Sequence, residues 1–108
     1  MRRTVLVLGL LALVTGAGWG LSAPALAAYD PDDEWQGLPA DDGREELYYN
    51  CIACHSTAII QQQRLNRRVW NDILVWMIED MGWPEPPEGE YELILDYLVD
   101  HFGQDVPR

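Results

Sequence analysis

The chain has 108 residues, with 18 acidic side chains against 7 basic ones, all of them arginine, for a formal net charge of −11. This acidic balance excludes general nucleic-acid binding, which needs a basic surface. It favours a basic or neutral protein partner that is approached by electrostatic steering. The length corresponds to a single domain.

Residues 1–27 have the pattern of a secretory signal peptide. A short basic start precedes an almost wholly apolar stretch over 4–19, and Ala25 and Ala27 are the small residues expected before a cleavage site. An uncleaved membrane anchor is the alternative, but glycines interrupt the apolar stretch, and no other segment is long enough to span a bilayer. We therefore expect cleavage after Ala27 and a periplasmic location for residues 28–108, with no membrane span left in them.

Residues 28–40 predict an acidic, extended lead-in that is not helical, because the segment is rich in Asp, Pro and Gly. Trp35 lies inside it, which indicates that the lead-in packs on the domain or on a partner. The 81 residues that follow Ala27 hold five arginines and 18 acidic residues, a net charge of −13. A chain of 81 residues has a small core and is marginal in stability without a cross-link or a bound cofactor. The folded domain is expected over 41–108.

A first helix is predicted to begin after Asp41 or Asp42, because either residue can act as an N-cap. Two glutamates in its first turn favour the helix N-terminus electrostatically. The helix carries Leu47 on its apolar side and leads directly into a Cys-x-x-Cys-His motif that begins at Cys51. The motif is therefore expected at the end of a helix and not in a strand.

Cys51, Cys54 and His55 form this motif, and the two cysteines are the only ones in the chain. The spacing is typical of c-type haem attachment: two thiols add across the haem vinyl groups, and the imidazole binds the iron as proximal ligand. A cysteine pair alone also fits a redox disulfide or half of a zinc site. One covalently bound haem c is favoured by the adjacent histidine, by the export signal and by the lack of a second ligand pair. The bound haem would also stabilise this small domain.

Two further helices follow the motif. Residues 56–65 are expected to form a turn and an irregular loop over one haem edge, and Asn66 is a natural N-cap for the second helix. Gly82 and the prolines after it predict where this helix stops, and the third helix is expected over about 88–102. The apolar residues of the second helix recur at three- and four-residue steps: Val69, Trp70, Ile73, Leu74, Met77 and Met81.

The sixth iron ligand is expected to come from the second helix. A methionine thioether opposite the histidine is common in electron-transfer haems, and Met77 and Met81 are the only methionines after the signal peptide. Because they are four residues apart, both are expected on one helix face. At least one of them is then core filler. His101, near the end of the third helix, is the alternative ligand.

The chain resembles class I c-type cytochromes. Gly43, Leu47 and Cys51 match the small and apolar residues that precede the motif in that family, and Tyr97 and Leu98 match the aromatic-aliphatic pair of its last helix. The resemblance implies an all-α, small class I cytochrome c-like fold, with three main helices around one covalently bound haem. It also implies that the first and last helices cross, with Gly43 allowing Tyr97 to approach closely.

A narrower resemblance, over 43–102, is to the small monohaem cytochrome subunit of periplasmic sulfite dehydrogenases and their relatives. It implies that Met77 is the axial ligand, with Met81 as the runner-up. The chain departs from the wider family because no Gly or Pro lies between 56 and 65 to provide the acceptor for the His55 ring N–H. The residues that carry the narrower resemblance are Cys51 to Ser56, Trp70, Met77, Ile78 and Gly82.

Three other side chains carry expectations. Arg64 is the candidate partner for the haem propionates, since it belongs to the one basic cluster of the domain. Trp70 is expected to pack on the haem. Trp76 lies off the apolar stripe and is expected either at a docking patch or partly buried.

Taken together, the sequence predicts a periplasmic monohaem c-type cytochrome, an iron-containing electron carrier that is not itself an enzyme. It would be the subunit of, or the shuttle for, a redox enzyme such as a sulfite dehydrogenase. Its expected partner is a redox protein, either a molybdenum-enzyme catalytic subunit or a basic electron acceptor. Two alternatives stay open: a five-coordinate haem protein that binds a small gas or peroxide, and a haem-free thiol–disulfide protein.

Overall fold

The computed structural model describes residues 18, 20 and 28–108. The predicted signal peptide over 1–27, with its cleavage site after Ala27, therefore lies outside the described residues except for two glycines. Within the described part, no helix is both long enough and apolar enough to cross a membrane.

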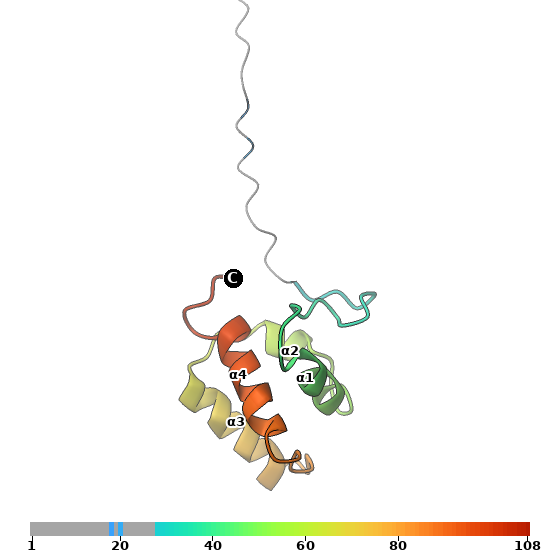
Figure 1. The fold of residues 1–108 in the computed structure, drawn as a ribbon, viewed down its shortest axis with the longest axis vertical. Coiled ribbons are helices and arrows are strands. Elements are labelled where there is room, and N and C mark those ends of the chain that lie inside the picture. Colours follow the sequence, from blue (N-terminus) through green and yellow to red (C-terminus); the bar gives the residue numbers. More distant parts are fainter. Residues whose placement is uncertain (1–17, 19, 21–27) are drawn as a thin grey trace, which may run out of the picture.

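Four helices make up the domain: α1 (Arg44–Cys51), α2 (Ala58–Gln61), α3 (Arg67–Glu79) and α4 (Glu90–Phe102). The described residues contain no strand, and the predicted all-α class is confirmed. α4 packs against both α1 and α3 and runs between them (Figure 1). The three long helices were expected, whereas the one-turn α2 stands where an irregular loop was predicted.

α1 begins later than predicted, with Gly43 and not Asp41 or Asp42 at its N-cap. Gly43 has a left-handed φ of 87°, and its carbonyl accepts the Leu47 N–H at 2.9 Å. Asp41 instead accepts the N–H of Asp42 at 2.9 Å, and it pairs with His101 of α4 at 2.9 Å. The expected aspartate cap was wrong because the chain must turn sharply at Gly43 to pass close to α4.

The crossing of α1 and α4 depends on the missing side chain of Gly43. A Cβ atom at this position would lie 2.5 Å from the carbonyl oxygen of Leu93 and 3.1 Å from the Cβ of Tyr97. Tyr97 is buried here, and its hydroxyl donates to the carbonyl of Pro39 at 2.7 Å. Burial raises the pKa of this phenol well above its usual value. The close approach of Tyr97 at Gly43 is thus present in the structure.

We expect Gly43→Ala to destabilise the domain much more than Gly89→Ala does. Both glycines are N-caps with similar left-handed φ values, 87° and 91°, but nothing lies within 4 Å of a Cβ added at Gly89. The control should cost about 1–2 kcal/mol for the left-handed backbone alone. The Gly43 variant should lose at least about 2 kcal/mol more, because α4 must also move. Thermal unfolding of the two variants measures the difference, and equal losses would contradict the close-approach argument.

α3 begins as predicted and ends earlier. The side chain of Asn66 accepts the N–H of Val69 at 3.0 Å, which is the expected N-cap bond. The helix stops at Glu79, so Met81 lies beyond its end and not on its apolar face. Gly82, with φ 76°, turns the chain so that the N–H of Trp83 reaches the Met77 carbonyl at 2.9 Å. The expectation that both methionines share one helix face was therefore wrong.

The core lies where the three long helices meet. Its largest fully buried side chains come from α1, α3 and α4, and the indole N–H of Trp70 donates to the Phe102 carbonyl at 3.0 Å. The buried residues of α4 are Ile94, Leu95, Tyr97, Leu98 and Phe102. The core consists of Leu38, Leu47, Cys51, Ile60, Trp70, Leu74, Ile94, Leu95, Tyr97, Leu98 and Phe102.

The acidic lead-in over 28–40 is folded back on the domain and is not extended. It runs through consecutive turns, Leu38 is buried in the core, and Trp35 packs edge-on against Tyr48 with ring centroids 5.2 Å apart. The side-chain oxygen of Gln36 accepts both the N–H and the hydroxyl of Thr57, each at 3.0 Å. The lead-in is therefore hydrogen-bonded to the segment that follows the Cys-x-x-Cys-His motif and holds it in place.

Candidate functional site

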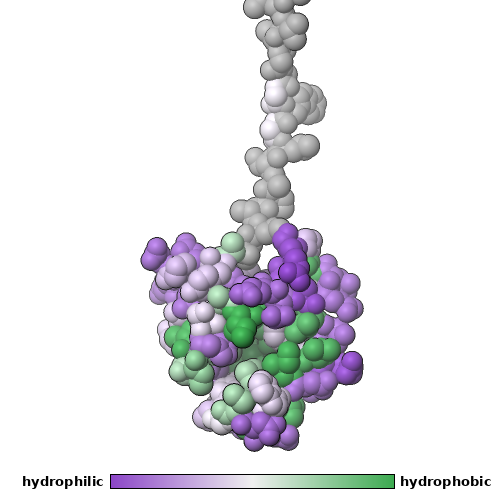
Figure 2. All heavy atoms as spheres, turned by 180° about the vertical axis from the view of Figure 1, so that it is seen from behind, coloured by the Kyte–Doolittle hydropathy of each residue, from purple (hydrophilic) through white to green (hydrophobic). Residues whose placement is uncertain are grey.

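A single cavity brings together the two cysteines, the histidine and both methionines that were predicted for the site. Its volume is ≈ 520 Å³, within the range of about 300–1,000 Å³ usual for ligand sites. No Asp, Glu or Arg is among the described residues that line it. Seen from behind, the domain shows apolar residues gathered near the middle of the face and hydrophilic ones around them (Figure 2). The lining residues whose sulfur or imidazole nitrogen atoms could bind a cofactor or its metal are Cys51, Cys54, His55, Met77 and Met81.

The two cysteines occupy the wall at the end of α1. Cys51 is the last residue of the helix and is buried, whereas Cys54 lies in the following turn and is exposed. The N–H groups of Cys54 and His55 both face the Cys51 carbonyl at 3.5 Å, so the motif is wound as a continuation of the helix. Both thiols are free. This places two thiols and one imidazole at the same cavity.

The environment of Cys51 disfavours a thiolate. Burial, with a smaller contribution from the negative charge of Cys54, raises the pKa of the Cys51 thiol to about 12. The helix end adds to this, because a thiolate is stabilised at a helix N-terminus and Cys51 stands at a C-terminus. Redox-active cysteine pairs work through an activated thiolate. These surroundings therefore disfavour Cys51 as the attacking thiol of a thiol–disulfide pair.

The ring of His55 has a backbone acceptor of its own. Its Nδ1 lies 3.0 Å from the carbonyl oxygen of Ser56. A carbonyl can only accept, so this hydrogen bond requires the tautomer with the proton on Nδ1, which leaves the Nε2 lone pair free for a metal. The acceptor that the sequence left unassigned is thus the next residue along the chain. Such a partner orients the ring and raises its basicity as a ligand.

Met77 and Met81 both line the cavity, but Met77 lies on a helix and Met81 lies in the loop that follows it. Met77 lies on α3 and packs partly buried against the core. Met81 lies beyond the helix and is 60% exposed. His101 is not among the lining residues, although Leu98, three positions earlier on α4, is one of them, and its ring is instead paired with Asp41. The structure therefore removes His101 as an alternative ligand and favours the better-held Met77.

Arg64 does not serve as the expected propionate partner. Its guanidinium donates to the carbonyls of Gln61, Gln63, Val106 and Pro107, at 2.6–3.1 Å for the shortest contacts. The sequence could not indicate this role, because two of these acceptors lie more than 40 residues away. Arg64 therefore holds the C-terminal tail in place by hydrogen bonds. Among the described residues, no arginine lines the cavity.

Polar lining residues that the sequence did not single out are Asn50 and Gln63. The side-chain oxygen of Asn50 accepts the indole N–H of Trp83 at 3.3 Å, which links the end of α1 to the loop after α3. Trp70 lines the cavity from the core, as expected, and Trp76 is half exposed at its margin. The position of Asn50, directly before the motif, was the one signal available for it.

These residues fit a covalently attached haem. The cavity offers an almost wholly apolar lining for the macrocycle, two thiols for its vinyl groups, an oriented imidazole and a thioether for the iron. A structural zinc site is not supported, since no group of three His, Cys, Asp or Glu side chains in the described residues could hold a metal ion.

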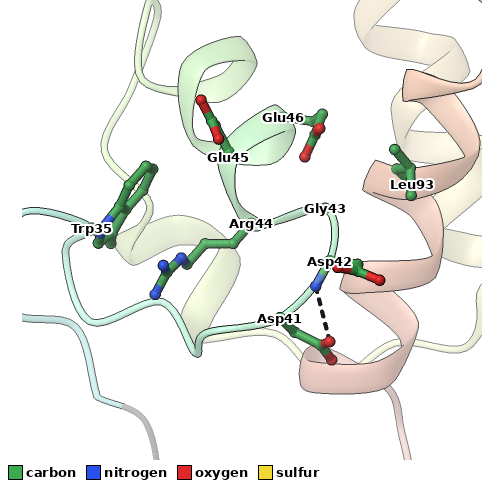
Figure 3. Close-up of a pocket in the computed structure, with 8 residues that line it drawn as sticks. All are labelled: Trp35, Asp41, Asp42, Gly43, Arg44, Glu45, Glu46 and Leu93. Atoms are coloured by element: carbon green, nitrogen blue, oxygen red, sulfur yellow. Dashed lines mark hydrogen bonds between the residues drawn. The ribbon is translucent and has the colours of Figure 1, made fainter.

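A second, smaller cavity of ≈ 280 Å³ lies at the start of α1 (Figure 3). Acidic side chains and Trp35 surround it, and Leu93 closes it from α4. Arg44 extends toward Trp35, with its guanidinium carbon 4.6 Å from the ring centroid. None of the predicted site residues lines this cavity, so it has no part in the chemistry of the motif.

Comparisons of the chain with protein-family models, with curated proteins and with solved structures found no match. The conclusions below accordingly depend on the residues and on their arrangement.

Proposed function

We propose that this protein is a periplasmic monohaem c-type cytochrome that transfers single electrons. One observation carries the proposal: both cysteines, the oriented His55 and two methionines line one apolar cavity. This combination supports covalent attachment of one haem c and its ligation by protein side chains on both faces.

Each residue has a defined task in this proposal. Cys51 and Cys54 would hold the haem through thioethers, His55 would bind the iron through Nε2, and Met77 would bind it through sulfur. The bound group supplies an iron atom that alternates between ferrous and ferric and so accepts or donates one electron. The apolar lining keeps water away, which limits reorganisation when the charge changes. With His55 and Met77 both bound to the iron, no open site would be left there for substrate chemistry.

The Met77 assignment is supported by its place on α3 and its packing against the core. A ligand held by a helix reaches a fixed position, whereas Met81 is largely exposed. We propose that the protein acts as a subunit of, or a shuttle for, a redox enzyme such as a sulfite dehydrogenase. Its partner would be a molybdenum-enzyme catalytic subunit or a basic electron acceptor.

The proposal is tested by redox titration of the chain produced by export in a bacterial host that matures c-type cytochromes. We expect a reversible one-electron transition, a pyridine haemochrome spectrum of the c type, and the weak near-red band of Met-to-iron ligation in the ferric form. A c-type haemochrome without that band, together with binding of added carbon monoxide or peroxide, would favour the five-coordinate alternative. Absence of any haemochrome would contradict haem attachment.

A further inference from the structure

We propose that the surface beside the cavity docks a basic protein, which is the partner in electron transfer. This inference rests on the proposed function and adds to it the place and the chemistry of the contact. The docking face, as we define it, consists of Ile59, Val75, Trp76, Glu79, Asp80 and Met81.

The centre of the docking face is exposed and apolar. Ile59 is 55% exposed, Trp76 50% and Met81 60%. All three also line the cavity, so part of each side chain would face a group bound there and the remainder would form the rim around it. Val75, 36% exposed, precedes Trp76 on α3 and lies four residues before Glu79, so it shares the side of the helix that carries Glu79. Large apolar side chains that gather on a surface typically mark an interaction site, and tryptophan is enriched among the residues that dominate binding. A partner seated here would contact the edge of the group that fills the cavity.

The charged residues of the docking face are both acidic. Glu79 and Asp80 follow Trp76 by three and four positions, so they share its side of α3. Both are exposed, and within residues 28–108 neither pairs with an arginine. Acids beside an apolar centre select a partner with the opposite charge and reject one with the same charge.

The arginines that could compensate these acids are held elsewhere. Arg67 pairs with Glu92 and Asp96 of α4, at 3.2 and 2.6 Å. Arg68 pairs with Asp72, and both arginines stand in the first turn of α3, far along the helix from Glu79. The acidic end of α3 therefore remains uncompensated within the described residues.

Two further observations about charge favour a basic partner. Among the residues that the structure describes, no arginine lines the cavity, so its walls would offer no guanidinium to the carboxylates of a bound haem. A second copy of the chain is disfavoured, because each copy carries a net charge of −13 over residues 28–108. We therefore assign the face to a lysine- or arginine-rich redox protein. In the transfer step, the ferrous chain loses one electron and the ferric partner gains it.

The test uses the haem-loaded chain, verified by its haemochrome, and a lysine-rich mitochondrial cytochrome c as the probe. With both proteins ferrous and diamagnetic, amide chemical-shift changes should concentrate at 59 and 75–81. Glu79→Gln with Asp80→Asn should weaken binding about fivefold at low salt, and Val75→Ser about twofold to threefold. Both losses come from residues that do not line the cavity. The effect of the charge variant should vanish at high salt.

The matched control is Asp100→Asn with Asp105→Asn. It removes the same amount of negative charge at the C-terminal end of α4 and just beyond it, away from the end of α3. This end lies against the start of α3, since the Leu65 N–H donates to the Phe102 carbonyl at 3.1 Å. The control should change binding by less than about twofold. Equal losses in both double variants, shift changes centred on another face, or self-association of the chain would each overturn the docking proposal. Such results would leave haem attachment intact, whereas a chain without haem would refute the proposed function instead.

Discussion

The double variant Cys51→Ala, Cys54→Ala is expected to lose all covalently bound haem and most of its helical structure. Without thioethers, nothing retains the cofactor through denaturation. An empty apolar cavity of ≈ 520 Å³ would cost on the order of 10 kcal/mol if enclosed. Even part of that cost approaches the whole stability of a small domain, about 5–15 kcal/mol. Haem staining after denaturing electrophoresis and far-ultraviolet circular dichroism measure the two losses.

The control for this variant is Ala53→Ser. Ala53 lies between the cysteines and is exposed, so the change keeps both thiols and their spacing. This control should retain a full complement of haem and normal helicity. If the double-cysteine variant kept haem through denaturation, or folded as fully as the control, the cysteines would have neither the attachment role nor the structural role that we propose.

Met77→Ala is expected to abolish the near-red Met-to-iron band and to lower the reduction potential. Removal of the thioether opens the sixth position and withdraws a ligand that favours ferrous iron. The variant should therefore also bind added imidazole, which the unaltered chain resists. Optical titration of the ferric protein measures the band and the imidazole binding together.

Met81→Ala is the matched comparison, because Met81 lines the same cavity yet is 60% exposed and lies beyond α3. It should keep the band and should resist imidazole as the unaltered chain does. The opposite outcome, with the band lost in Met81→Ala and kept in Met77→Ala, would transfer the ligand role to the loop methionine.

Helices whose signals are local could be predicted from the sequence. Asn66 caps α3 as expected, and the apolar repeat predicted for that helix includes its two buried residues, Trp70 and Leu74. Where the deciding contact is distant along the chain, the prediction was wrong. Gly43 caps α1 because α4 passes over it, some 50 residues later. The lead-in was expected to be extended, but Gln36 is bound to Thr57, 21 residues away.

The same distinction between local signals and distant contacts applies to the site. The cysteine and histidine spacing is local, so the sequence placed these side chains together, and the structure places all three at one cavity. The hydrogen bond from His55 to Ser56 depends on backbone direction, which no residue pattern encodes. Arg64 was expected near the propionates, yet its acceptors lie in the C-terminal tail. The different supports of the two methionines follow from the end of α3 at Glu79.

The intact mass of the exported protein tests the central claim most directly. Covalent attachment adds one haem to the polypeptide and survives denaturation, and signal cleavage after Ala27 removes residues 1–27. We predict a mass equal to that of residues 28–108 plus one haem. A mass equal to the polypeptide alone, or to the polypeptide less two hydrogens for a Cys51–Cys54 disulfide, would contradict the account.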